Sequence, residues 1–498
     1  MNRKLKKVLS VIAVCVAAWT THPAMAVTRY ASPTGGDSNG TSPDRPGPFS
    51  ALAKKLQAGD TLYLADGQYN FKDVITLSNS GSAGKYITIA AADGAKPILD
   101  FRETPNSTNA LVVRGNYYHI KGITLRYSGY KGIWLEKVKY CILENLEVYG
   151  CCDSGIQLRS GGYNLVVNCD SHDNFDYQNK GGNADGFADK QGNSCPGNVY
   201  IGCRAWNNSD DGWDSYQRVT SDDKPTVYIH CMTYNNGQAT FDLSQHPRAN
   251  GVDKNLSCFS GKDLANFSNG GNPNGFKLGG KQTVHHTELY RCLAIGHRGK
   301  GFDQNNNSGI MTIVNCTSYN NQTNYGFGNS TPYTLYLYNS ISLAPTSGTH
   351  LRTGGSGETI VQSHNSWSSG FSVSDKDFKS LDVEGLLLAP RNADGSLSET
   401  LLLRLDDDAT ALIDKGRDYE GISFKGDSIV NYLSYAGAKP DLGCYETVPQ
   451  ASSIAPITLT PQASYDPNAP MFDLSGRRVD ASYKGVVVQY GKIFYKGQ

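Results

Sequence analysis

The segments NVYIGCRAWNN (Asn198–Asn208) and TVYIHCMTYNN (Thr226–Asn236) share one pattern, an alternation of apolar and polar residues with a cysteine before a polar turn. The pattern returns along the chain, and a basic period near 23 residues with inserted loops is typical of a stacked solenoid. The cysteine slot is filled in turn by Ile123, Leu146, Cys169, Cys203, Cys231, Cys292, Cys316 and Ser340, at steps of 23, 23, 34, 28, 61, 24 and 24 residues.

A glycine followed by an apolar residue comes after each copy. Short strands at this period, with alternating apolar residues, predict an all-β chain folded as a right-handed parallel β-helix. Cysteines in one slot of successive coils are then expected to form a buried ladder rather than disulfides. A bridge among Cys151, Cys152, Cys195 and Cys258 stays open. The glycine pairs are Gly132-Ile133, Gly155-Ile156, Gly186-Phe187, Gly212-Trp213, Gly275-Phe276, Gly301-Phe302 and Gly326-Phe327.

The two ends of the chain differ from the repeat. Residues 1–26 combine a basic start, an apolar run and a small-residue cleavage site, which predicts a signal peptide and a secreted, cell-surface or periplasmic protein. Residues 27–447 are expected to form the β-helix, with a short helix at Phe49–Ala58 as its N-terminal cap. Residues 448–463 have the composition of a linker, and residues 464–498 are expected to form a small β module that resembles the sorting modules of secreted bacterial proteins.

The composition excludes some partners. Lys and Arg total 46 and balance 46 Asp and Glu, so no bulk charge favours nucleic acid. After the signal peptide, no apolar run is long enough to predict a membrane span. We expect a monomer.

The stretch NSDDGWDS (Asn208–Ser215) gathers three carboxylates beside an aromatic residue. Equivalent slots of successive coils stack at about 4.8 Å, so the glycine register converts sequence into position. In this register Asp185, Asp210, Asp211 and Asp214 converge on one face. A hard divalent cation would relieve their repulsion, and Ca²⁺ accepts irregular carboxylate-rich sites more readily than Mg²⁺ does.

The same register places Lys277 about one coil from Asp214. A nearby cation and burial both lower the pKa of a lysine, which makes Lys277 a candidate general base. Asp303, one coil further on, would favour the charged form and oppose that role. A calcium ion and a lysine base suit abstraction of the proton next to a uronate carboxylate, followed by β-elimination.

Four motifs carry a resemblance to a known family. NADGFA (Asn183–Ala188), WNNSDDGWD (Trp206–Asp214), NGFKLGG (Asn274–Gly280) and GFDQNNN (Gly301–Asn307) resemble polysaccharide lyase family 9, the pectate lyase and rhamnogalacturonan lyase group, over residues 28–447. The resemblance implies a right-handed parallel β-helix that cleaves pectin. It also implies that Asp185, Asp210, Asp211 and Asp214 bind calcium and that Lys277 is the Brønsted base.

Two questions stay open about the substrate. The sequence does not separate homogalacturonan from rhamnogalacturonan I or another uronate polymer, nor endo from exo action. An excursion of about 38 residues before Lys277 is expected to wall the groove. Basic and aromatic side chains near the site are candidates for substrate binding, and they are Lys190, Arg218, Lys281, Arg298, Lys300 and Tyr216.

Two other functions compete with the lyase. A polygalacturonase-type hydrolase also uses a β-helix and carboxylates, two of them adjacent, and Asp210-Asp211 suits it. Hydrolysis, however, needs an acid and a base or nucleophile without a metal, and the register of Lys277 and the fourth aspartate fits a lyase better. A non-catalytic, calcium-stabilised carbohydrate-binding solenoid would bind pectin without forming an unsaturated product.

Overall fold

The structure is a computed structural model that describes residues 25–37, 39–220, 224–355, 357–387, 389–419, 433, 435 and 437–447, together with four C-terminal strands. The predicted linker, and nearly all of the predicted signal peptide, lie outside the described residues. In the described part of the chain, no helix has the length and apolar character that a membrane span requires.

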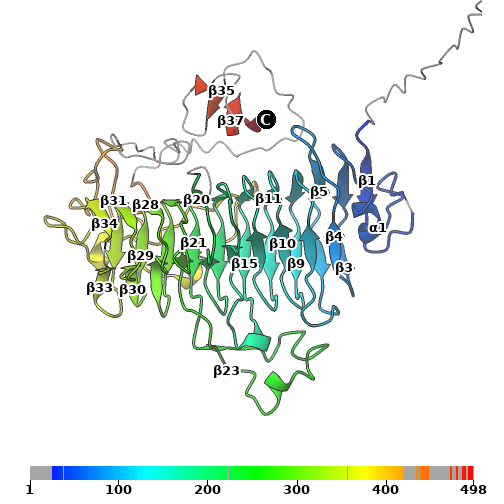
Figure 1. The fold of residues 1–498 in the computed structure, drawn as a ribbon, viewed down its shortest axis with the longest axis horizontal. Coiled ribbons are helices and arrows are strands. Elements are labelled where there is room, and N and C mark those ends of the chain that lie inside the picture. Colours follow the sequence, from blue (N-terminus) through cyan, green and yellow to red (C-terminus); the bar gives the residue numbers. More distant parts are fainter. Residues whose placement is uncertain are drawn as a thin grey trace, which may run out of the picture.

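Three long parallel sheets wind into a β-helix, in which each complete coil contributes one strand to each sheet (Figure 1), and β1 (Thr28–Ala31) and β34 (Thr359–Ser363) extend the first sheet at its two ends. Sheet I has 12 strands, and sheets II and III have 10 each. Sheet I consists of β1 (Thr28–Ala31), β2 (Thr61–Leu64), β5 (Ile87–Ala91), β8 (Tyr118–Lys121), β11 (Ile142–Glu144), β14 (Leu165–Val167), β17 (Val199–Ile201), β20 (Thr226–Ile229), β25 (Thr287–Tyr290), β28 (Ile310–Val314), β31 (Thr334–Tyr338) and β34 (Thr359–Ser363).

Sheets II and III are built in the same way. Sheet II consists of β4 (Ile75–Leu77), β7 (Leu111–Val113), β10 (Ile133–Glu136), β13 (Ile156–Arg159), β16 (Phe187–Lys190), β19 (Trp213–Asp214), β24 (Phe276–Lys277), β27 (Lys300–Asp303), β30 (Thr323–Phe327) and β33 (Thr349–Thr353). Sheet III consists of β3 (Gly67–Asn70), β6 (Pro97–Asp100), β9 (Thr124–Arg126), β12 (Glu147–Tyr149), β15 (Asp170–His172), β18 (Arg204–Trp206), β21 (Met232–Tyr234), β26 (Leu293–Ile295), β29 (Thr317–Tyr319) and β32 (Ile341–Leu343).

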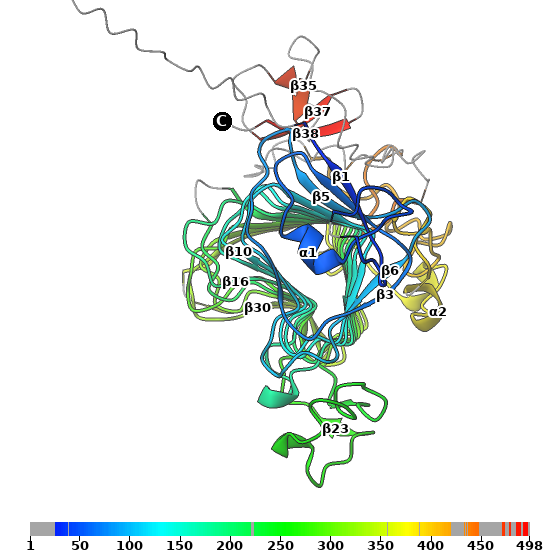
Figure 2. The ribbon, with the colours of Figure 1, turned by 90° about the vertical axis from the view of Figure 1, so that its right-hand side faces the viewer.

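The remaining elements lie outside the three sheets. The helix α1 (Phe49–Ala53) is shorter than predicted and lies in the N-terminal opening of the coil (Figure 2), where Phe49 and Leu52 are buried. The helix α2 (Glu384–Leu387) and the short 3₁₀ turns Tyr177–Asn179, Ser257–Phe259 and Asp375–Asp377 lie in connections. The strands β35 (Met471–Asp473), β36 (Arg478–Val479), β37 (Gly485–Gln489) and β38 (Lys492–Lys496) form a separate four-stranded antiparallel sheet.

The predicted cysteine ladder is present in the core. Cys169, Cys203, Cys231, Cys292 and Cys316 are fully buried on successive coils, and each is a free thiol. In the part of the chain that the structure describes, the four cysteines for which a bridge was left open are also free, so that bridge is not formed: Cys151, Cys152, Cys195 and Cys258.

Asparagines stabilise the corners that follow sheet III in two ways. Asn207 and Asn235 take the left-handed backbone conformation, with φ of 52° and 53°, which asparagine tolerates better than most residues. Asp173 takes the same conformation on the preceding coil, and the residue after each of these three is an asparagine that points inward. Asn174 donates its side-chain N–H to the amide oxygen of Asn208 (2.7 Å), and Asn208 donates in the same way to Asn236 (2.8 Å). All three inward asparagines are fully buried.

Replacing Asn208 with alanine is expected to destabilise the coil by about 3 kcal/mol, because the buried N–H donors of Asn174 on one neighbouring coil lose their acceptor and the amide oxygen of Asn236 on the other loses a donor. Urea unfolding measures this change. The matched control is Asn207→Gly, which suits the left-handed backbone and should cost less than about 1 kcal/mol. Equal effects at the two positions would show that the inward ladder contributes little.

The predicted register holds over most of sheet II and shifts at one coil. Asp303 pairs with Gly326, whereas the glycine alignment placed it opposite Gly328. The reason is the aromatic stack inside the coil, in which Tyr325, and not Phe327, packs against Phe302 with ring centroids 5.0 Å apart.

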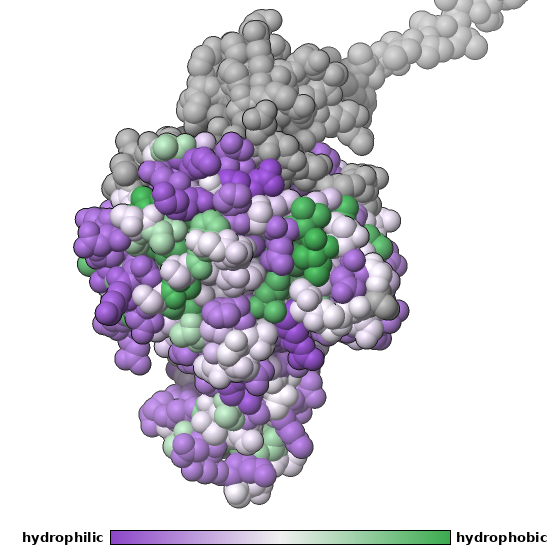
Figure 3. All heavy atoms as spheres, turned by 90° about the vertical axis from the view of Figure 1, so that its left-hand side faces the viewer, coloured by the Kyte–Doolittle hydropathy of each residue, from purple (hydrophilic) through white to green (hydrophobic). Residues whose placement is uncertain are grey.

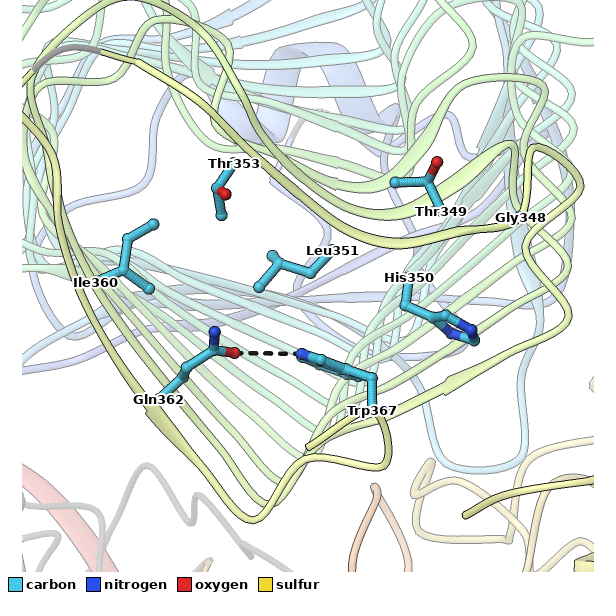
Figure 4. A pocket seen from close by; sticks show the side chains of 8 residues that line it. All are labelled: Gly348, Thr349, His350, Leu351, Thr353, Ile360, Gln362 and Trp367. Carbon is cyan, nitrogen blue, oxygen red and sulfur yellow. Dashed lines mark hydrogen bonds between the residues drawn. The ribbon is translucent and has the colours of Figure 1, made fainter. Parts of the chain in front are cut away.

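The C-terminal end of the coil stack has an apolar face with a pocket. Figure 3 shows this end, where apolar side chains gather, and Figure 4 shows the pocket, in which Trp367 donates a hydrogen bond to Gln362 (3.2 Å). The pocket is lined by residues of β33 and β34 and by Trp367. The strand β33 lies three strands beyond the strand of Lys277 in sheet II, and none of the lining residues is acidic. The pocket therefore offers no carboxylate to a metal ion.

Candidate metal and catalytic site

The site lies on the outer face of sheet II and on the corner that leads into it. Asp214 on β19 pairs with Ala188 on β16 and with Lys277 on β24, and Lys277 pairs with Asp303 on β27. Because all these strands are parallel and in register, the side chains follow one another along the coil axis. This is the order that the glycine register predicted for these coils.

Three carboxylates meet where two coils enter sheet II. Asp185, Asp210 and Asp211 are at most 5% exposed, and one oxygen from each lies within 4.8 Å of the others. The Oδ1 atom of Asp185 is buried and has no hydrogen-bond partner. Buried polar atoms are normally paired, so this oxygen and its two carboxylate neighbours form a donor set suited to a hard cation.

Hydrogen bonds fix the orientation of these carboxylates. Asp210 accepts the backbone N–H groups of Asn183 (2.8 Å) and Asn272 (2.5 Å). Asp211 accepts the side-chain N–H of Asn274 (2.9 Å), and the Ser154 hydroxyl donates to Asp185 (2.9 Å). The acids are thus held by groups from three different coils.

Two buried lysines complete the cluster. Lys190 donates to Asp185 (2.8 Å) and Asp214 (3.0 Å), and Lys277 donates to Asp211 (2.8 Å) and lies 3.3 Å from Asp214. Asp214, predicted as a fourth metal ligand, therefore lies between the two ammonium groups and outside the group of three carboxylates.

Burial and mutual repulsion set the protonation of the acids. Burial, followed by the charges of Asp210 and Asp214, raises the pKa of Asp211 to about 8 despite Lys277. Burial would also raise the pKa of Asp214, but Lys190 and Lys277 hold it below its ordinary value. Burial alone would lower the pKa of Lys277, and the surrounding acids, Asp211 foremost, raise it well above its ordinary value.

Asp303 was expected to oppose the base role of Lys277, but it pairs with a different lysine. Asp303 accepts a hydrogen bond from Lys300 at 2.7 Å, and its other contact is the backbone N–H of Asn305. Asp303 is therefore neutralised on its own coil and does not bond to the Lys277 ammonium.

The candidate substrate-binding residues fall into three groups. Lys190 belongs to the buried cluster. Arg218 is fully buried and paired with Asp189 (2.5 Å), so its expected role at a substrate surface does not fit this position. The others reach the surface or its edge: Tyr216 and Lys300 are half-buried, and Lys281 and Arg298 are exposed.

The excursion before Lys277 has an anchor that the sequence did not reveal. It leaves the coil after β21, carries the antiparallel pair β22 (Thr240–Phe241) and β23 (Phe267–Ser268), and projects from the coil in Figure 1. Arg248 within it is fully buried, pairs with Asp253 and donates to the backbone oxygens of Phe101 (3.1 Å) and Thr104 (2.8 Å). A lone arginine in a polar loop gives no signal of such a contact.

The chain is similar to several known proteins. Residues 29–340 match a family model described as Pel9A-like, right-handed β-helix region. The chain is 33% identical over 434 residues to pectate lyase L of Dickeya dadantii, covering 84% of this chain and 90% of that protein.

Solved structures give the same result. The crystal structure of pectate lyase Pel9A superposes with a TM-score of 0.67 at 32% identity, covering 84% of this chain and 96% of that one. A rhamnogalacturonan lyase superposes with a TM-score of 0.65 at 25% identity, covering 77% of this chain and 98% of that one.

Proposed function

This chain belongs to the Pel9A-like family of right-handed β-helix polysaccharide lyases, and on that premise we propose that it cleaves a pectic polysaccharide by calcium-dependent β-elimination. In this proposal Lys277 is the Brønsted base, and Asp185, Asp210, Asp211 and Asp214 provide the calcium site. The observation that carries it is the meeting of three buried carboxylates with the Lys277 ammonium, 2.8 Å from Asp211.

The donor set fits calcium. Oxygen ligands from several carboxylates, in no regular polyhedron, are what Ca²⁺ accepts and Mg²⁺ disfavours. The four acids and the two lysines Lys190 and Lys277 sum to a formal charge of −2 when all are ionised, which one divalent ion balances. When bound, calcium supplies positive charge that pairs with a uronate carboxylate and offsets the attraction of the acids for the Lys277 proton.

The residues of the site then have different roles in the reaction. Lys277 takes the proton from C5 of the uronate, the electron pair of that C–H bond forms the C4–C5 double bond, and the bond from C4 to the glycosidic oxygen breaks. The leaving oxygen takes a proton from water. Asn274 and the backbone of Asn272 hold the carboxylates so that the Lys277 amine faces the substrate from a fixed position.

Further parts of the proposal concern the protein as a whole. We infer that it is exported as a monomer, with a mature chain beginning at Val27. The substrate is proposed as pectin. The solved pectate lyase is 32% and the rhamnogalacturonan lyase 25% identical to this chain, with TM-scores of 0.67 and 0.65, and a panel of polymers decides between homogalacturonan and rhamnogalacturonan I.

Incubation with a panel of polymers tests the function. Polygalacturonate, rhamnogalacturonan I and alginate are each incubated with the full chain and calcium, and the ultraviolet absorbance of unsaturated sugar ends is followed together with new reducing ends. A pectic lyase produces both signals together on a pectic polymer and not on alginate. A hydrolase would produce reducing ends alone, and a binding module would produce neither.

A further inference from the structure

We propose that Trp134, Gln157 and Arg159 form a distal subsite that binds an acidic sugar of the polymer, on the coils that precede the metal and catalytic site. This inference rests on the proposed function, since it assigns a second contact to the same substrate. The three residues lie on β10 and β13, on the side of the coil where Figure 2 labels β10 and β16.

The strand register places this subsite in line with the catalytic residues. Trp134 pairs with Gln157, Gln157 with Ala188, Ala188 with Asp214, and Asp214 with Lys277. Each pairing is one step of about 4.8 Å, so Gln157 lies about 14 Å and Trp134 about 19 Å from Lys277 along the coil axis. A sugar residue in a polymer is about as long as one step, so a chain lying along sheet II would reach the subsite three or four sugars from the cleaved bond.

Two side chains at this place have polar atoms that need a partner. Gln157 is only 1% exposed, and its Oε1 atom has no hydrogen-bond partner. Trp134 is half-buried, and its buried Nε1–H likewise has no acceptor. Buried polar groups are normally paired. One unpaired acceptor and one unpaired donor on adjacent strands match the hydroxyl groups of a sugar, which can donate and accept.

The charge and the ring at this place match an acidic sugar. The guanidinium of Arg159 lies 6.0 Å from the centre of the Trp134 ring, and Arg159 is exposed. Among the described residues Arg159 has no ion pair, because the neighbouring Glu136 is engaged by Arg114 (2.8 Å). An unpaired guanidinium binds a carboxylate with two parallel hydrogen bonds, and the aromatic ring offers an apolar face to the sugar ring.

Substrate length provides the test. With polygalacturonate, Arg159→Ala and Trp134→Ala are each expected to raise KM about tenfold while kcat stays near the wild-type value. With trigalacturonate, which is too short to span from Lys277 to the subsite, both variants should match the wild type. Lys121→Ala, which removes a cation from β8 on sheet I and leaves the Arg114–Glu136 pair intact, is the control and should leave both substrates unaffected.

Binding measured without turnover separates this proposal from the proposed function. In a Lys277→Ala background, calorimetry with a long oligogalacturonate should show about tenfold weaker binding when Arg159→Ala is added, and no change with trigalacturonate. Unchanged binding of the long oligosaccharide, or an equal loss for both lengths, would overturn the subsite. Absence of unsaturated product from the wild-type protein would instead overturn the proposed function and leave this binding test valid. Arg159 is exposed, so its variant tests the subsite even if Trp134→Ala does not fold.

Discussion

Replacing Lys277 with alanine is expected to reduce kcat on polygalacturonate by about 10³-fold or more, because positioned proton transfer contributes on the order of 10²–10⁴ to rate. The ammonium lies against Asp211 and Asp214 on the outer face of sheet II. The rate of appearance of unsaturated product measures the change.

The control for Lys277→Ala is Lys121→Ala. Lys121 also lies on a strand of the coil and pairs with a carboxylate, Glu144 (2.8 Å), but on sheet I. It should retain wild-type activity. If Lys277→Ala folds with the wild-type melting temperature and keeps more than about a tenth of the wild-type rate, Lys277 does not act as the base.

The variant Asp211→Asn is expected to weaken calcium binding at least about 100-fold, since it removes one of three carboxylates that share the site and leaves the shape of the side chain unchanged. Titration of calcium into the chelator-treated protein, monitored by calorimetry, measures this affinity directly.

Asp303→Asn is the matched control for Asp211→Asn. Asp303 is also a buried aspartate paired with a lysine, at the end of β27, but it lies outside the group of three carboxylates. It should bind calcium as the wild type does. Equal calcium affinity in Asp211→Asn and in the wild type would show that calcium binds elsewhere or does not bind to the protein.

The repeat allowed much of the fold and of the site to be predicted, because in a β-helix neighbouring coils are also neighbours in sequence order. The glycine before each strand of sheet II aligned Asp214 with Lys277, and the strands pair as that alignment required. The recurring cysteine position likewise predicted the buried ladder. The alignment was wrong only at Gly326. There the Gly326-Phe327 pair predicted the wrong strand register, and the packing of Tyr325 in the aromatic stack sets the observed one.

The rest depends on contacts between distant segments, which the repeat does not encode. Arg248 reaches the backbone of Phe101 across 147 positions of sequence. The Arg218 side chain pairs with Asp189 in the interior, although its charge and its position near the site suggested a surface role. The pairing of Lys190 with both Asp185 and Asp214 depends on how far a flexible side chain extends, which strand register alone leaves undetermined.

In the proposed function, cleavage by elimination depends on one divalent ion at the acidic cluster. The most direct test follows ultraviolet absorbance on polygalacturonate as calcium is added back to the chelator-treated protein. Without calcium no unsaturated product is expected, and with calcium the rate should saturate with the same calcium dependence as binding measured by calorimetry. Cleavage that persists in the presence of chelator, or that gives reducing ends without ultraviolet absorbance, would contradict the proposed function.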